Sequence, residues 1–370
     1  MRRIGCLALV LLGACASGGS NDPQGPDTVV LCGRASSGPE EQGSTGPYTV
    51  VAFDRVRISS LQEEENFQNA RTRIDVGCGP FERATLVVEL ESPCYPFSKW
   101  REPGAIPPGH LWPAECDAFD RTFTFQLLPR REGEPKLELV RAITPFGGPM
   151  QFEVDVTDVA NGLPGEHELE VHIGTWPDPS GQVTGARGSW FVSAHLEMVP
   201  GEPPRKVRAV VPLFFENWSG PGEELRFDYE FEIPEGTRKG RIEYRATGHG
   251  GGEPIAGCIG PAEEFCNRVH EVWVGDRMAG YFAPWVSCAD NCTVVEDDPD
   301  TPFAYCAENP CAGHGSARAP RANWCPGRVT EPIVIEHPFL NLPGPQTASW
   351  VVDRMGAGIW TVSAVYYAYE

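Results

Sequence analysis

The sequence has almost none of the patterns that predict long helices. Its 41 glycines and 36 prolines interrupt the 370 residues every few positions, and no window carries a long apolar stripe at helical spacing between helix caps. Beyond the first residues it also has no run of about eighteen apolar residues, which a transmembrane helix would need. The sequence therefore excludes a helical bundle and a helical membrane protein.

Basic residues are scarce relative to acidic ones. The chain has 30 Lys and Arg against 51 Asp and Glu, which gives a formal net charge of −21 and a pI of about 4.8. Such a surface repels nucleic-acid phosphates and anionic lipid headgroups. We therefore expect no nucleic-acid partner and no direct docking of the folded body on a membrane.

The first residues have the features of an export signal. Arg2 and Arg3 precede a short apolar stretch, residues 4–12, which is too short to span a bilayer. The sequence LGAC that ends at Cys15 resembles the bacterial lipobox, in which the cysteine becomes the lipid-modified first mature residue. Cleavage near Ala14 or Ala16 without a lipid is the alternative.

The segment after this signal predicts a flexible tether. Residues 16–47 are rich in Gly, Ser, Pro and Gln, and such a composition buries too little apolar area to fold. We assign a lipoprotein signal peptide to residues 1–15 and the tether to residues 16–47. We expect an exported protein, lipid-anchored to a bacterial outer membrane or cell surface, that touches the membrane only through the lipid on Cys15.

Strand patterns recur along the rest of the chain. Short segments alternate apolar and polar residues, as strands with one buried face do. They cover residues 48–53, 84–90, 121–128, 150–156, 167–173, 206–215, 224–233, 240–247, 269–274 and 350–369. The sequence PGEPP at 200–204 separates two sets, because proline can neither pair in a central strand nor continue a helix. These features predict an all-β fold of two tandem antiparallel β-sandwiches, residues 48–200 and 205–370.

Thirteen cysteines in an exported chain predict disulfide staples. Without Cys6 in the signal and Cys15, their number is odd, so that one thiol is free or one pairing is not accounted for. The spacing suggests three local bridges, Cys32–Cys78, Cys94–Cys116 and Cys258–Cys266. A zinc site is the rival interpretation of the remaining cluster, but paired CxxC spacings are missing and export favours disulfides. That cluster comprises Cys288, Cys292, Cys306, Cys311 and Cys325.

One segment combines a cysteine, two carboxylates and the start of a strand, namely CDAFDR at 116–121. An acid held where a strand leaves a disulfide-closed loop lies on a rigid scaffold, as a catalytic group must. Asp120 is therefore a candidate for chemistry, although turn aspartates are commonly caps or Asx turns. If the strand is regular, Arg121 points to the opposite face of the sheet and need not neutralise Asp120.

Two further segments repeat this design. The disulfide loop 258–266 carries Glu264, with Arg268 close behind it, and the segment 320–327 carries Arg321 next to a tryptophan and a cysteine. Carboxylates and guanidinium groups bind hydroxyls and amides, while aromatic faces stack on sugar rings. The three loops together therefore predict a carbohydrate or amide site.

Eight short motifs occur in order between about residue 48 and residue 370. They are CDAFDR (116–121), ITPF (143–146), DVTD (155–158), LEVHIGTW (169–176), AVVP (209–212), GH (248–249), AEEFCNRVH (262–270) and WCPG (324–327). Each is short, but their order across both expected domains is specific. Together they resemble the peptide-N-glycosidase F family of glycoasparagine amidases.

The resemblance implies a fold of two jelly rolls packed side by side, with the site in the cleft between them. It implies hydrolysis of the bond between an asparagine side-chain nitrogen and its acyl carbon, in an N-linked glycoprotein or glycopeptide and without a metal or other cofactor. We expect a monomer. The matching catalytic acids are Asp120 and Glu264, and the matching substrate-binding residues are Arg121, Trp176, His249, Arg268 and Arg321.

The residue types suit this chemistry. An amide is a poor electrophile, so that a base must activate water and hydrogen-bond donors must hold the developing oxyanion. Asp120 would activate or orient the water, and Glu264 would hold the first sugar. Arg121 and Arg321 would keep Asp120 ionised, because an adjacent cation favours a charged carboxylate.

The sequence departs from the family pattern at three positions. Gly174 stands where a third site carboxylate is expected, while Phe119 and Thr247 stand where tryptophans are expected. Loss of a carboxylate and of a stacking face raises a second hypothesis, a glycan-binding surface lipoprotein without turnover on the same scaffold.

A third hypothesis is a copper-dependent oxidoreductase, because paired jelly rolls also resemble the fold of peptidylglycine monooxygenases. Those enzymes need clustered histidines. The chain has 8, none of them adjacent or separated by one residue. An isolated histidine is more often a hydrogen-bonded structural residue than a ligand, so that we expect no metal site.

Overall fold

The computed structural model describes residues 46–219, 227–251, 257–353, 355 and 358–370 of the chain. The expected signal peptide, the lipid site expected at Cys15 and nearly all of the expected tether lie outside these ranges. These expectations therefore remain predictions.

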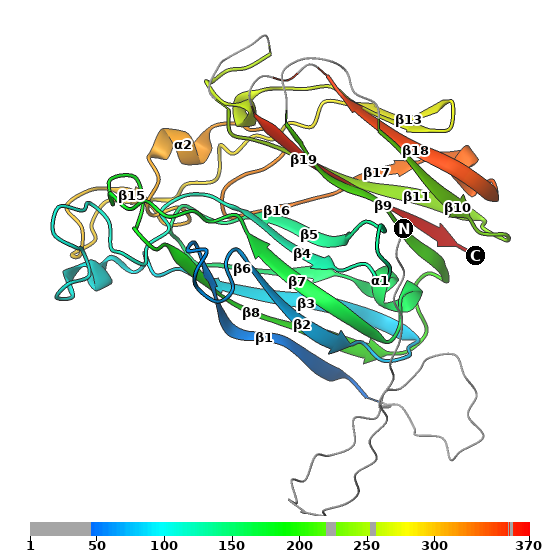
Figure 1. Ribbon diagram of the computed structural model, residues 1–370, viewed down its shortest axis with the longest axis horizontal. Helices are drawn as coiled ribbons and strands as arrows, with labels where there is room; N and C mark the ends of the chain where they lie inside the picture. Colours follow the sequence, from blue (N-terminus) through cyan, green and yellow to red (C-terminus); the bar gives the residue numbers. More distant parts are fainter. Residues whose placement is uncertain (1–45, 220–226, 252–256, 354, 356–357) are drawn as a thin grey trace, which may run out of the picture.

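The N-terminal half forms a sandwich of two antiparallel sheets (Figure 1). Its outer sheet has the order β1-β8-β3-β6, with the strands Tyr48–Ser59, Ser189–Pro200, Phe81–Glu91 and Met150–Asp155. Its inner sheet has the order β16-β5-β4-β7-β2, with the strands Val329–Thr330, Leu137–Ile143, Thr122–Leu127, Glu166–Ile173 and Asn69–Asp75. The short helices η1 (Phe97–Arg101) and α1 (Thr157–Gly162) lie in connections.

The C-terminal half forms a second sandwich of antiparallel sheets, drawn above the first in Figure 1. Its inner sheet has the order β17-β11-β19-β9, with the strands Ile333–Glu336, Lys239–His249, Ile359–Tyr369 and Val207–Ser219. Its outer sheet has the order β10-β18-β12-β13, with the strands Phe227–Ile233, Gly344–Val352, His270–Val274 and Arg277–Phe282. The smaller elements are the pair β14 (Val294–Val295) and β15 (Tyr305–Cys306), η2 (Glu263–Phe265), α2 (His314–Arg318) and η3 (Pro338–Asn341).

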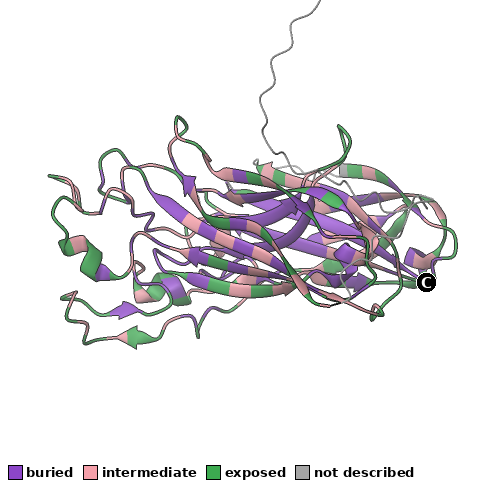
Figure 2. Cartoon of the chain, turned by 90° about the horizontal axis from the view of Figure 1, so that it is seen from below, coloured by how far each residue is buried: buried purple, intermediate pink, exposed green. Residues whose placement is uncertain are grey.

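Side-chain alternation decides which face each strand buries. In β4, Phe123 and Phe125 enter the core of the N-terminal sandwich, where Trp190 of β8 is fully buried. The C-terminal core is built in the same way around Trp350 of β18 and Trp360 of β19. Figure 2 shows the result, with buried strand segments in the interior and the exposed residues concentrated on the surface and in the loops.

The two sandwiches pack against each other through their inner sheets. Helix α1 contacts β9, and Val210, Tyr367 and Tyr369 of the C-terminal inner sheet join the core of the N-terminal sandwich. The strand β16 also crosses over, since it pairs with β5 although it follows most of the C-terminal strands in the sequence. The division expected at 200–204 lies in the connection between β8 and β9, and the domain limits remain a prediction.

An ion pair with no exposed surface fixes this contact. Arg141 of β5 donates from Nε to Glu138 Oε1 at 2.8 Å and from Nη2 to Glu138 Oε2 at 2.7 Å. Arg141 also donates hydrogen bonds across the interface, to the hydroxyl of Thr247 and the carbonyl oxygen of Thr361. In the other direction, the hydroxyl of Ser363 donates to Glu138. Because buried charges are costly without partners, this network specifies how the inner sheets dock.

The disulfides agree with the expected staples. Cys94–Cys116 and Cys258–Cys266 are confirmed, and Cys78 is disulfide-bonded, although its expected partner Cys32 lies outside the described residues. The cluster expected to prefer disulfides over zinc forms Cys288–Cys325 and Cys292–Cys306. Within the described part of the chain, Cys311 is the cysteine left free.

The expected all-β fold of disulfide-stapled jelly-roll sandwiches is confirmed. One expected strand is wrong in extent, because residues 350–369 contain the end of β18 at Val352 and a separate strand, β19, from Ile359. In the described ranges, no helix has the length and apolar character needed to cross a membrane.

Candidate functional site

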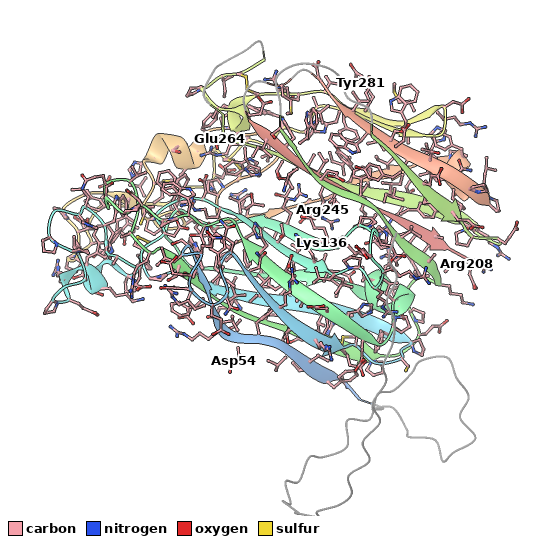
Figure 3. All side chains as sticks on the ribbon, in the orientation of Figure 1. Asp54, Lys136, Arg208, Arg245, Glu264 and Tyr281 are labelled. Carbon is pink, nitrogen blue, oxygen red and sulfur yellow. A yellow bond between two sulfur atoms is a disulfide. The ribbon has the colours of Figure 1, made fainter. Side chains whose placement is uncertain are left out.

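A cavity of about 660 Å³ lies between the inner sheets of the two sandwiches. Strands β4 and β7 form one wall, and β9 and β19 contribute the opposite one. In Figure 3, Glu264 belongs to the upper, C-terminal half and Lys136 to the lower, N-terminal half. The predicted site residues that line this cavity are Asp120, Arg121, Trp176, His249 and Glu264.

The loops that carry the two acids are held at both ends. Asp120 lies between Cys116, which is bonded to Cys94, and the first residue of β4. Glu264 lies in η2, inside the short loop closed by the Cys258–Cys266 disulfide. Covalent closure limits the conformations of the loop that carries Glu264, and the bonded Cys116 and β4 anchor the short segment that carries Asp120, so that both carboxylates are positioned before any ligand binds.

A single guanidinium group joins the two acids. Arg321 is fully buried, and its Nη1 lies 2.6 Å from Glu264 Oε1, while its Nη2 lies 3.8 Å from Asp120 Oδ2. The backbone carbonyl oxygen of Ser316 accepts a further bond from Nη2 at 2.9 Å. The ring of Trp324 lies 4.5 Å from the guanidinium carbon. These contacts fix Arg321 in place, so that both acids meet the same positive charge.

The carboxylate of Asp120 is buried, and its charge is only partly neutralised by its neighbours. Its side chain is 12% exposed, and within the described residues Oδ2 has no hydrogen-bond partner. Burial raises the pKa of Asp120 to about 7, and the nearby charge of Glu264 acts in the same direction. The cations Arg321 and Arg121 oppose that rise in the pKa. A carboxyl group that titrates near neutral pH can both accept and donate a proton under physiological conditions.

Arg121 has another carboxylate as its main partner. Its Nε lies 2.9 Å from Asp117 Oδ2 and its Nη2 lies 2.5 Å from Asp117 Oδ1. Asp117 is itself fully buried and accepts further bonds from Thr175 and Trp190. Arg121 is therefore held rigidly beside the cavity, with Asp117 as its ion-pair partner. The charges of Arg121 and Arg321, which we expected to keep Asp120 ionised, lower its pKa but do not outweigh the effect of burial.

Aromatic rings cover both sides of the acids. The guanidinium carbon of Arg121 lies 4.6 Å from the ring centre of Trp176, which is 38% exposed and faces Phe119. Across the cavity, His249 stacks on Trp324 with ring centres 5.1 Å apart. Trp324 is itself buried, so that the exposed face of Trp176 is the one that can stack on the apolar face of a sugar.

His249 is a neutral hydrogen-bonding group. Burial, with the nearby charges of Arg141 and Arg321, lowers the pKa of His249 to about 3. Its Nε2 lies 2.8 Å from the hydroxyl of Thr247. Because the imidazole is uncharged at neutral pH, His249 can orient a substrate group but cannot serve there as a general acid.

The structure does not support the expected substrate-binding role of Arg268. This residue is 3% exposed, and its Nε lies 2.6 Å from Oε1 of the buried Glu263. Glu263 also accepts a hydrogen bond from Trp360. The two adjacent acids therefore differ in their surroundings: Glu263 forms a buried ion pair with Arg268, while Glu264 faces the cavity.

Two of the three departures from the family pattern, Gly174 and Thr247, have different consequences. Gly174 lines the cavity, and a β-carbon built there would meet only His172 Nε2, at 3.7 Å. The missing side chain therefore leaves open space. Thr247, by contrast, is buried, and its hydroxyl is hydrogen-bonded to His249 and Arg141, so that it helps to fix the position of His249.

Several residues in or next to the cavity were not assigned a role from the sequence. Asp117 and Trp324 lie inside quoted motifs, and their positions near Asp120 and Arg321 could have suggested their support function. The polar residues farther along the cavity look like ordinary polar positions of alternating strands, although two of them also lie inside the motif at 169–176. They are Asn69, Gln126, Lys136, Glu170 and His172.

Groups of potential metal ligands occur away from the two acids. In the described part of the chain they are Cys94, Cys116 and Cys311; Cys292, Cys306 and His314; and Cys258, Glu263 and Cys266. Each group contains both cysteines of a disulfide, and bonded sulfurs provide no thiolate ligand. None of these groups has the clustered histidines that the copper hypothesis requires.

Comparison with known proteins agrees with this geometry. The model of the family described as peptide-N-glycosidase F, C terminal, matches residues 223–341. The peptide-N(4)-(N-acetyl-beta-D-glucosaminyl)asparagine amidase F of Elizabethkingia miricola is 28% identical over 227 residues, which span 57% of this chain and 56% of that protein. The match thus covers little more than half the length of this curated relative.

Solved structures show the same fold. A crystal structure of peptide-N(4)-(N-acetyl-beta-D-glucosaminyl) asparagine amidase superposes with a TM-score of 0.65 at 18% identity, covering 88% of this chain and 96% of that one. PNGF-II superposes with a TM-score of 0.61 at 18% identity over 87% of this chain and 65% of that one. With the family model and the curated relative, these similarities support the resemblance expected from the sequence: the chain is similar to the peptide-N-glycosidase F family.

Proposed function

We propose that the chain hydrolyses the amide bond that links an N-linked glycan to an asparagine side chain, with Asp120 and Glu264 as the catalytic acids. The observation that supports this most directly is the placement of both acids on the buried guanidinium of Arg321, in the wall of the cavity between the sandwiches. The relatives of this chain named as asparagine amidases support the same reaction.

Asp120 is suited to activate water. In its ionised form it accepts a proton while the water oxygen attacks the acyl carbon of the asparagine side chain. Because the pKa of Asp120 is about 7, the ionised form is well populated at neutral pH and is more basic than an ordinary aspartate. The guanidinium groups of Arg121 and Arg321 provide N–H donors that can stabilise the developing oxyanion.

The second half of the reaction returns this proton. The carbon–nitrogen bond breaks, the nitrogen takes the proton from Asp120, and the glycan leaves as a glycosylamine while the peptide retains aspartate. Glu264 and the exposed face of Trp176 would hold the first sugar, since a carboxylate accepts hydroxyl protons and an indole stacks on a sugar face.

Incubation with a denatured N-glycosylated protein tests the proposal. We expect released glycosylamine and conversion of the glycosylated asparagine to aspartate, both detected by mass spectrometry. Asp120→Asn should abolish both products. Asp54→Asn is the matched control, because Asp54 is exposed on β1 at the far side of the N-terminal sandwich (Figure 3). Turnover that survives in Asp120→Asn would remove Asp120 from the mechanism.

A second candidate function is glycan binding without hydrolysis. Gly174 and Thr247, which stand in place of an acid and an aromatic residue, favour it. A glycan array that shows binding by a wild-type protein lacking turnover would support this alternative. Any turnover that Glu264→Gln abolishes would contradict it.

We also propose that the protein is exported, acts as a monomer on N-linked glycoproteins and is held at a bacterial outer membrane or cell surface by a lipid on Cys15. The LGAC sequence and the polar segment after it support this localisation. Cys15→Ala should release the protein into the soluble fraction. An unchanged membrane fraction would contradict the proposed anchor.

A further inference from the structure

A second cavity, of about 410 Å³, lies between the two sandwiches, with β5 and β6 on one side and β11 on the other. We propose that this cavity, called the rear cavity below, binds a small monocarboxylate that carries hydroxyl groups, such as a uronic acid. Arg245 of β11, which Figure 3 shows between the two sandwiches, would hold the carboxylate. The inference does not depend on the proposed amidase reaction.

Alternate residues of β11 connect the rear cavity with the catalytic one. Arg241 and Arg245 line the rear cavity, whereas His249, farther along the same face of the strand, lines the cavity that holds the two acids. Thr247 lies between them and accepts a hydrogen bond from the fully buried Arg141. The buried network at the interface therefore separates the two cavities.

The charges inside the rear cavity alternate and leave one cation in excess. Asp158 accepts hydrogen bonds from Arg205 at 3.1 Å and from Arg241 at 3.2 Å. Glu243 accepts hydrogen bonds from Arg241 at 2.7 Å and from Arg245 at 3.3 Å. Three guanidinium groups thus share two carboxylates. A ligand with a single negative charge would neutralise the remaining positive charge.

Arg245, at the end of this chain of charges, has donors without a partner. The residue is 5% exposed, and its Nε and Nη1 make no hydrogen bond within the described residues. The same holds for Nε of Arg241 and for the hydroxyl of Thr330, and both residues line the cavity. Buried donors without a partner are costly, so that a ligand that accepts hydrogen bonds from them would be stabilised. A carboxylate provides such acceptors.

The rim of the cavity carries acidic side chains instead. Glu153, Asp155 and Glu331 line the cavity and are exposed. These carboxylates accept hydrogen bonds from hydroxyl groups, but they repel a ligand with more than one negative charge. They therefore disfavour phosphate and sulfate and favour hydroxyl groups on the part of the ligand that lies away from Arg245. A sugar acid combines one carboxylate with several hydroxyls, and the cavity volume is within the range of small-ligand sites.

Isothermal titration calorimetry with sodium glucuronate, glucose and sodium propionate tests both parts of the ligand. We expect glucuronate to bind with a dissociation constant of about 1 mM, the affinity of a few polar contacts. Glucose lacks the carboxylate and propionate lacks the hydroxyls, so that each should bind at least about tenfold more weakly.

Three results of these titrations would overturn the proposal. One is the absence of glucuronate binding at concentrations up to about 20 mM. Another is equal affinity for glucose and glucuronate, because the carboxylate would then have no role. The third is displacement of glucuronate by an equimolar amount of chloride, since Arg245 would then need only a simple counter-ion.

Arg245→Gln removes the excess charge and the unpartnered donors. It leaves Glu243 paired with Arg241 at 2.7 Å, so that we expect a folded protein, which circular dichroism checks. Its affinity for glucuronate should fall at least about tenfold, the effect of losing a hydrogen bond to a charged group. Arg208→Gln is the matched control, because Arg208 lies at the start of β9 in an exposed ion pair with Glu370 (Figure 3). This control should keep the affinity within about twofold.

Thr330→Val keeps the proposal testable if Arg245→Gln does not fold. It removes only a hydroxyl that has no partner within the described residues, so that the interface should keep its packing. We expect the affinity for glucuronate to fall about three- to tenfold. Asp120→Asn should leave it within about twofold, because Asp120 lines the other cavity. Unchanged affinity in both rear-cavity variants, or a loss in Asp120→Asn alone, would place the ligand elsewhere and reject the rear cavity.

Discussion

Arg321 holds Glu264 at 2.6 Å and leaves Asp120 at 3.8 Å, although the same guanidinium group faces both acids. Glu264 is therefore the firmly paired carboxylate, and Asp120 is the buried one whose charge is incompletely neutralised. The incomplete neutralisation of Asp120 is consistent with its raised pKa, which suits a group that must exchange protons near neutral pH.

The pH dependence of hydrolysis should follow Asp120. In the proposed mechanism its ionised form is the base, and the pKa of this carboxyl is about 7, so that kcat/KM should rise with pH and level off above about 8. Steady-state kinetics between about pH 5 and about pH 9 would locate the inflection in the plot of kcat/KM against pH. An inflection near the ordinary aspartate pKa would contradict a role for Asp120 as the base.

Replacing Asp120 should stabilise the protein at alkaline pH. Because folding raises this pKa from 3.8 to about 7, the stability present below about pH 4 is lost as pH rises through about 7. Asp120→Asn removes that buried charge but also the contact with Arg321. We expect a net gain of roughly 1–2 kcal/mol in the free energy of unfolding at pH 8 and a smaller difference at pH 4.

Urea unfolding of the wild type and Asp120→Asn at the two pH values measures this difference. The exposed substitution Asp54→Asn should change the free energy of unfolding by less than about 0.5 kcal/mol at either pH. A destabilised Asp120→Asn at pH 8 would show that its carboxylate is well compensated, contrary to the burial and the unpaired Oδ2.

Asp117 should be more important for stability than Asp120 or Glu264. Asp117→Asn leaves the buried Arg121 without its carboxylate, a change that costs about 3–5 kcal/mol in comparable buried pairs. The exposed pair of Arg55 and Glu91 provides the contrast, because Glu91→Gln should cost less than about 1 kcal/mol. Chemical denaturation of both variants tests the difference, and similar costs would argue against the burial of Asp117.

Much of the candidate site could be predicted because its residues lie in cysteine-bounded loops. Asp120 and Glu264 stand beside half-cystines, and Arg321 stands four residues before one. The family resemblance added their order and their meeting between the two sandwiches. The strand β5 was missed for a physical reason: every residue from Leu137 to Ile143 is buried, since one face enters the core and the other meets the second sandwich.

Arg268 shows where sequence reasoning ends. It follows Glu264 by four residues and Glu263 by five, and only the turn of η2 decides which of the two acids faces inward to pair with it. The polar wall of the cavity was equally hidden, because Gln126 and His172 look like ordinary polar positions of alternating strands. Their common cavity follows from the pairing of β4 with β7.

Cys311 should be chemically inert in the folded protein. It is the free cysteine of the described residues, and its sulfur lies within 4.8 Å of the bonded sulfurs of Cys94 and Cys116. Burial, together with the charge of Asp117, raises the pKa of the Cys311 thiol well above its usual range. Because the thiolate is the reactive form, both alkylation and attack on the neighbouring disulfide are suppressed.

Iodoacetamide labelling followed by peptide mass spectrometry tests this expectation. Cys311 should be modified at least about a hundredfold faster in the denatured protein than in the native one. Rapid native labelling, or a scrambled Cys94–Cys311 bridge at neutral pH, would show that the thiol is exposed and the loop before Asp120 is labile.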